Sequence, residues 1–171
     1  LNITTTAAAG DIKSYTAVLM GGQGNVNAGS FYSSKDNTVM FQASAITNQS
    51  SVDFVFWYGA TSLYAIGAPT NSDANTAFTP LFDSWTTKND TKFKKVTGVN
   101  FDGITDDSVI TAQATGLTDT KVASLTVNDV VAFETAATST YASRKGIFKV
   151  LEVSGTSGAT RTIKIQVKIQ D

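Results

Sequence analysis

The clearest pattern of hydrophobic and polar positions lies at the C-terminal end of the chain. Within Thr160–Gln170, isoleucine or valine at every second position alternates with Lys164, Gln166 and Lys168. Successive side chains of a strand point to opposite faces, so this alternation predicts a strand with one buried and one solvated face, paired antiparallel. Lys145–Ser154 predicts a preceding strand, and the sequence GTSGA between the two predicts a hairpin loop.

The remaining strand signals are shorter apolar runs. Val52–Gly59 (VDFVFWYG) is almost continuously apolar and is bounded by turn residues, which is typical of a buried central strand. Tyr15–Gly21, Leu63–Gly67 and Val127–Thr135 predict further strands, and Lys92–Val99 predicts an edge strand.

Helical signals are few. Asp106 and Asp107 stand at the head of Asp106–Ala114, as expected for a short helix that ends at Gly116. Thr38–Gln49 is ambiguous between a helical stripe and extended chain, whereas Pro80–Trp85 is long enough for one helical turn. We interpret the intervening residues 71–79 as a polar loop.

Together these elements predict a mainly β fold, with antiparallel sheets packed as a sandwich and one or two short helices. The alternative is an α+β fold, with helices at 38–49 and 106–114 packed on one face of an antiparallel sheet. The chain of 171 residues has no internal repeat or linker, so we expect a single β-rich domain over residues 11–171. Residues 1–10 are expected to be a tether left after removal of an export signal, or the start of an excised domain.

The balance of basic and acidic residues indicates whether the protein binds nucleic acid. The chain has 13 basic and 14 acidic residues, a net charge of −1, and nucleic-acid binders carry a basic excess on at least one face. The local cluster of Lys88, Lys92, Lys94 and Lys95 is diluted by Asp90 and is typical of a solvated strand edge. We therefore expect no nucleic-acid partner.

The residue types also restrict catalysis. The sequence contains neither cysteine nor histidine, which excludes a Ser-His-Asp triad, a Cys-His pair, and thiolate or imidazole zinc sites. Carboxylates remain as acid–base groups, and a glycosidase needs two of them facing each other. The candidates for such a pair are Asp53, Asp83, Asp102, Glu134 and Glu152. No spacing brings two of them together, so we expect a protein that is not an enzyme and that needs no cofactor.

One cluster of oxygen ligands raises the alternative of a calcium site. Asp102, Asp106 and Asp107 lie in NFDGITDD and have the oxygen density that Ca²⁺ favours. The spacing differs from the twelve-residue calcium loop, and Asp106 and Asp107 are also explained as helix-start residues.

Aromatic and amide side chains suggest a ligand site. Flat aromatic faces and amide groups bind sugars, whose rings present C–H patches and hydroxyls. Trp85, flanked by Ser84 and Thr86, is the candidate for an exposed platform, with Tyr64 and Asn89 as further candidate ligand contacts.

Several segments together resemble a family of uncharacterised exported lipoprotein-like domains from Bacteroidetes. They are Gly29–Val39 (GSFYSSKDNTV), Asn48–Gly59 (NQSSVDFVFWYG), Trp85–Phe93 (WTTKNDTKF), and the closing pair GIFKVLEV and IKIQVKIQ. The resemblance covers about half of the chain. It implies export, a lipid anchor on a cysteine outside this chain, and a cell-surface setting, and it assigns no functional residues.

We therefore expect a non-catalytic binding or adhesion module located outside the cytoplasm, at the cell surface or in the periplasm. Its expected partner is a glycan or a surface protein, and it would meet a membrane only through the lipid anchor. One alternative is a structural or spacer domain of an envelope assembly. The other is a carboxylate-dependent glycan hydrolase.

Overall fold

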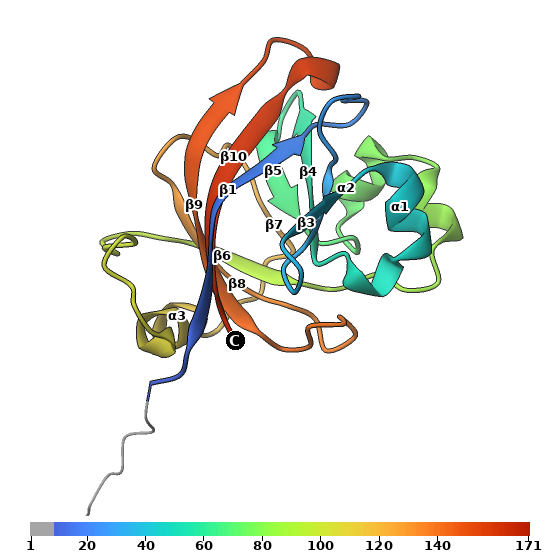
Figure 1. The fold of residues 1–171 in the computed structure, drawn as a ribbon. Coiled ribbons are helices and arrows are strands. Elements are labelled where there is room, and N and C mark those ends of the chain that lie inside the picture. Colours follow the sequence, from blue (N-terminus) through green and yellow to red (C-terminus); the bar gives the residue numbers. More distant parts are fainter. Residues whose placement is uncertain (1–8) are drawn as a thin grey trace, which may run out of the picture.

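Residues 9–171 are described by a computed structural model, in which two antiparallel five-stranded sheets face each other (Figure 1). Sheet A has the order β1-β10-β9-β8-β6, with β1 Ile12–Gly21, β10 Thr162–Gln170, β9 Lys145–Ser154, β8 Val130–Glu134 and β6 Lys92–Val96. Sheet B has the order β3-β2-β4-β5-β7, with β3 Thr38–Met40, β2 Phe31–Ser33, β4 Phe54–Gly59, β5 Leu63–Gly67 and β7 Lys121–Val122.

The inner faces of the sheets form the central core of the sandwich. Phe54 of β4 packs edge-on against Phe133 of β8, with ring centroids 5.5 Å apart, and both side chains are fully buried. The alternating apolar side chains of β10 are also fully buried. The predicted mainly β sandwich is thus confirmed, and β10 has the buried face that its alternation predicts.

Both edges of sheet A are irregular or charged. The pairing of β1 with β10 shifts between Tyr15 and Val18, where a bulge leaves Thr16 and Ala17 exposed. At the other edge β6 pairs only with β8 within the sheet and carries the exposed Lys94 and Lys95. The predicted edge strand is confirmed, although it ends at Val96.

Short helices cover the outer face of sheet B. They are α1 (Gln42–Thr47) and α2 (Ser72–Ala77), followed by the 3-10 turns Gln49–Ser51 and Leu81–Ser84 respectively. The Asn71 side chain begins α2 by accepting hydrogen bonds from the backbone N–H groups of Asp73 and Ala74. The polar loop expected at residues 71–79 is therefore wrong, because an N-cap asparagine initiates a helix there.

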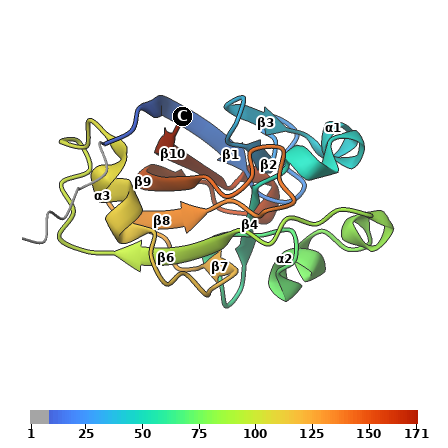
Figure 2. The same ribbon diagram turned by 90° about the horizontal axis from the view of Figure 1, so that it is seen from below.

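The outer face of sheet A has a different cover. It consists of α3 (Asp107–Gln113) and of residues 97–106, which we call the strap. Asp106 begins α3 by accepting from the Ser108 backbone N–H at 2.9 Å, as the sequence predicted. Figure 2 shows α3 on the opposite side of the molecule from α1 and α2.

Lys168 of β10 was expected to be solvated, and this expectation is wrong. The side chain is only 6% exposed, because the strap covers this end of the strand. Its ammonium group donates hydrogen bonds to the backbone carbonyls of Phe101 (3.0 Å) and Ile104 (2.7 Å). Burial lowers the pKa of Lys168.

A buried carboxylate fixes the start of β4. Asp53 is fully buried and accepts hydrogen bonds from the Ser34 backbone N–H (2.7 Å), the Ser34 hydroxyl and the Ser139 hydroxyl (2.5 Å). Desolvation raises the pKa of Asp53, and the hydrogen bonds from the serines oppose that rise. Asp53 thereby ties together segments that are 19 and 86 residues away in the sequence.

Most of the expected N-terminal tether, residues 1–8, lies outside the described residues. Gly10 is held in place, since its N–H donates to the Asp107 carboxylate at 2.6 Å. Among residues 9–171, every helix is too short or too polar to cross a lipid bilayer.

Candidate binding site

The expected tryptophan platform is not at the surface. Trp85 is 6% exposed and packs in a second apolar cluster, between sheet B and its helices, against Phe31 and Phe82 at ring distances of 6.0 and 4.7 Å. The expectation of an exposed Trp85 is wrong, because the turn Leu81–Ser84 directs the indole inward although its neighbours are polar.

Tyr64 and Asn89 are both occupied by contacts within the protein. The Tyr64 hydroxyl donates to the Ser154 carbonyl at 3.1 Å and accepts from Arg161 at 2.7 Å. Asn89 is fully buried, and its amide nitrogen donates to the carbonyls of Ser50 and Val52. These bonds hold loops together, and the structure does not bring Tyr64, Trp85 and Asn89 to one surface.

The three aspartates suggested for calcium have separate partners. Asp102 forms an ion pair with Lys149 at 3.1 Å, Asp106 caps α3, and Asp107 accepts from Gln170 at 2.9 Å. Within residues 9–171 no group of three or more acidic side chains converges on one point. The structure therefore leaves these aspartates as local structural groups.

The candidate carboxylates for glycan hydrolysis are dispersed in the same way. Asp53 is buried among serine hydroxyls, and Glu152 is paired with Lys164 at 2.7 Å. Glu134 lies opposite Lys145 in the pairing of β8 with β9. Asp83 is exposed on the turn Leu81–Ser84.

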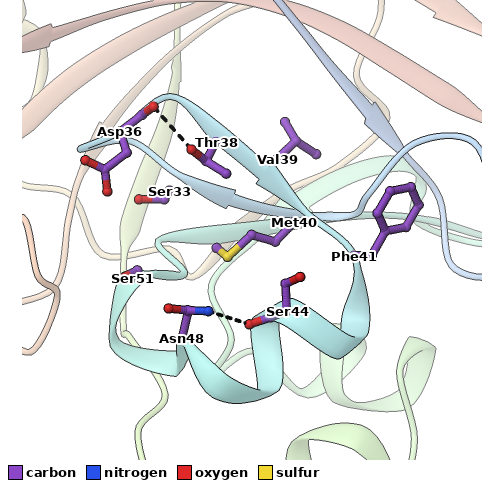
Figure 3. A pocket seen from close by; sticks show the side chains of 9 residues that line it. All are labelled: Ser33, Asp36, Thr38, Val39, Met40, Phe41, Ser44, Asn48 and Ser51. Atoms are coloured by element: carbon purple, nitrogen blue, oxygen red, sulfur yellow. Dashed lines mark hydrogen bonds between the residues drawn. The ribbon is translucent and has the colours of Figure 1, made fainter.

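A hollow of about 340 Å³ lies between the β2–β3 hairpin and helix α1 (Figure 3). The hairpin forms one wall, and α1 with the turn that follows it forms the other. We call this the hydroxyl hollow, since four of its nine lining residues are serine or threonine. The lining residues are Ser33, Asp36, Thr38, Val39, Met40, Phe41, Ser44, Asn48 and Ser51.

Ser33 is the most informative of these residues. It lies on β2 opposite Thr38 and is 2% exposed, and its hydroxyl has no hydrogen-bond partner among the described residues. A buried polar group without a partner costs about 1–3 kcal/mol, so such groups are rare in folded proteins. Ser33 borders the hollow, while its hydroxyl oxygen is shielded from solvent.

The rim of the hydroxyl hollow combines an aromatic ring with polar groups. Phe41 is 47% exposed, one of several large apolar side chains that residues 9–171 expose. The Asn48 amide nitrogen donates to the Ser44 carbonyl at 2.8 Å, which orients the amide on α1 (Figure 3). Asp36 supplies the one carboxylate of the lining.

Two further hollows border the helices over sheet B. One, of about 310 Å³, lies between the β4–β5 turn and α2 and is lined by residues including Tyr58 and Asp73. Asp73 is paired with Lys121, which lowers the pKa of that carboxyl. The other, of about 390 Å³, shares Phe41 with the hydroxyl hollow.

The hydroxyl hollow could hardly be predicted from the sequence. Ser33 and Thr38 belong to strands of three residues, which are too short for a periodic pattern. Phe41 precedes a six-residue helix whose register the sequence left ambiguous. The signal that was present is the density of Ser, Thr and Asn between residues 30 and 51.

Comparison with known proteins identifies a similar fold but assigns no activity. No family model matches the chain, and no curated protein matches it. Its fold is similar to the crystal structure of a DUF4466 family protein from Parabacteroides merdae ATCC 43184, with a TM-score of 0.66 and 14% sequence identity.

The similarity covers 94% of this chain and 54% of the other, so this chain spans about half the length of that protein. At this identity the likeness shows a shared fold. The neighbour comes from the bacterial group, Bacteroidetes, that the resemblance in the sequence named.

Proposed function

We propose that this protein is a non-catalytic, extracytoplasmic binding module whose ligand is a glycan held in the hydroxyl hollow. The observation that carries the proposal is the set of short polar side chains that lines the hollow together with the exposed Phe41.

The chemistry of the lining supports a sugar. Sugar rings have hydroxyls at their edges and C–H groups on their faces, so they bind where short polar side chains surround an apolar surface. Ser44 and Asn48 supply polar groups on the α1 side, Thr38 supplies one on the hairpin, and the exposed Phe41 ring supplies the apolar surface.

The lining also supports binding without catalysis. Glycoside hydrolysis commonly uses two carboxyl groups on opposite sides of the scissile bond. Asp36 is the single carboxylate among the nine lining residues. The extracytoplasmic location, at the cell surface or in the periplasm, is supported by the resemblance to exported domains.

The proposal is tested by screening the purified protein on a glycan microarray, with calorimetry for each hit. Phe41→Ala should weaken binding at least tenfold, the effect of losing about 1.4 kcal/mol of interaction.

The matched control is Ile46→Ala, which removes another exposed apolar side chain, 41% exposed, from α1. Ile46 does not line the hydroxyl hollow, so this variant should bind as the wild type does. Unchanged binding by folded Phe41→Ala would place the ligand elsewhere, and a wild-type protein that binds no glycan would contradict the proposal.

A further inference from the structure

Phe41 separates two hollows. On one side lies the hydroxyl hollow, and on the other lies a second hollow of about 390 Å³, lined by residues that include Val26, Ala43 and Phe78. Phe41, which belongs to both linings, is 47% exposed. A molecule seated in the hydroxyl hollow would therefore meet the second hollow directly beyond this ring.

The second hollow contains unusual apolar exposure. Val26 is 82% exposed, the highest value among the large hydrophobic side chains described as exposed. Val26 and Phe41 lie 15 positions apart in the chain, yet they line the same hollow. Exposed apolar side chains that gather at one place mark a binding surface more often than scattered ones do.

The two hollows are alike in having almost no charged lining residues. Among their described lining residues, Asp36 is the one charged side chain, and it carries a negative charge. The second hollow offers the uncharged amides of Asn25 and Gln42 beside its apolar side chains. An acidic or sulfated sugar would find no cation there and would be repelled by Asp36.

From this arrangement we infer that the ligand is an extended neutral oligosaccharide. One sugar unit occupies the hydroxyl hollow, the chain crosses the face of Phe41, and further units reach the second hollow beside Val26. This inference rests on the proposed function and specifies the ligand of the same site.

The test is a calorimetric titration with neutral oligosaccharides of two to six units from the cello, xylo, manno and malto series. A parallel titration uses oligogalacturonates of the same lengths. In at least one neutral series, affinity should rise about tenfold or more from the shortest to the longest member. Oligogalacturonates should bind at least tenfold more weakly.

The variant that isolates the second hollow is Val26→Ser. Because Val26 is almost fully exposed, this change should leave folding intact while it removes most of the gain in affinity with length. Binding of the shortest member should stay as in the wild type. The matched control is Val127→Ser, at an exposed valine (48%) that lines neither hollow.

The outcomes are distinguishable. Binding that depends on Phe41 but neither on ligand length nor on Val26 would overturn the extended ligand and leave the proposed function standing. Tighter binding of oligogalacturonates would overturn the neutral ligand. Wild-type protein that binds none of these series and no glycan on the microarray would overturn the proposed function, and this inference with it.

Discussion

The two sheets of the sandwich are covered in different ways on their outer faces. Over sheet A, the strap lies close enough to bury Lys168, and the ammonium group finds backbone carbonyls to bond. Over sheet B, α1 and α2 bury Trp85 and Ser33 but leave the indole N–H and the hydroxyl without partners among the described residues.

The buried polar group over sheet A thus has hydrogen-bond partners, whereas the two over sheet B have none among the described residues. A cover that satisfies its buried polar groups adds stability, whereas one that leaves them unpaired loses stability. The hollows described above all border the helices over sheet B. We therefore expect ligand binding on the side of sheet B, and four changes compare how much buried groups on the two sides contribute to stability.

The largest effect should come from Trp85→Ala. The side chain is buried against Phe31 and Phe82, so its loss should lower the free energy of unfolding by about 3–5 kcal/mol, the usual cost of emptying a large aromatic site. Urea denaturation measures this loss in the free energy of unfolding. A loss below about 1 kcal/mol would show that the indole is not part of this cluster in solution.

The next effect should come from Lys168→Met, which keeps the length of the side chain and removes its donors. The carbonyls of Phe101 and Ile104 lose their partner, so we expect a loss of about 2 kcal/mol and faster amide hydrogen exchange in the strap. Lys164→Met is the control on the same strand. Lys164 is partly exposed and paired with Glu152, so its loss should cost less than about 1 kcal/mol.

A change in pH dependence is expected for Asp53→Asn. Burial raises the pKa of Asp53 above its ordinary value of 3.8. The folded protein thus retains a proton that the unfolded chain has already released. The stability contributed by this carboxyl is fully present below about pH 4 and is lost as the pH rises through the folded-state pKa.

The unfolding free energy of the wild type relative to Asp53→Asn should accordingly fall as the pH rises from 4 to 7. Denaturation series at several pH values measure this difference. A difference that stays constant with pH would contradict the raised pKa.

The smallest effect on stability should come from Ser33→Ala. Its hydroxyl has no partner to lose, so the free energy of unfolding should stay within about 0.5 kcal/mol of wild type or rise slightly. The neighbouring Ser34→Ala removes a donor to the buried Asp53 and should cost about 2 kcal/mol. Equal losses for the two serines would show that Ser33 has a partner within the protein.

The sequence predicted the parts of the fold in which apolar and polar residues alternate regularly, or in which a capping residue marks the start of a helix. The bounds expected for β5 and β9 are those observed, and Asp106 begins α3 as expected. Helix α2 was missed although Asn71 is a good N-cap, because no apolar stripe follows it that sequence reading could detect.

The candidate site was largely beyond sequence reasoning. Trp85 was placed at the surface because Ser84 and Thr86 flank it, but flanking polarity says nothing about direction in a segment without a period. Lys168 lies on the polar face of β10, as the alternation predicts. Its burial depends on the strap, which lies more than 60 residues away in the chain. Burial of this kind is decided by long-range packing.

The two edge strands of sheet A affect whether separate copies of the protein associate through their sheets. A straight, uncharged edge strand exposes a row of backbone donors and acceptors, which invites the edge strand of another molecule. The bulge at Thr16 and Ala17 interrupts one such row, and at the other edge the Phe93 N–H already donates to the Asp119 carbonyl at 2.8 Å, beside the exposed Lys94 and Lys95. Copies crowded side by side are thus kept from joining their A sheets into a continuous ribbon.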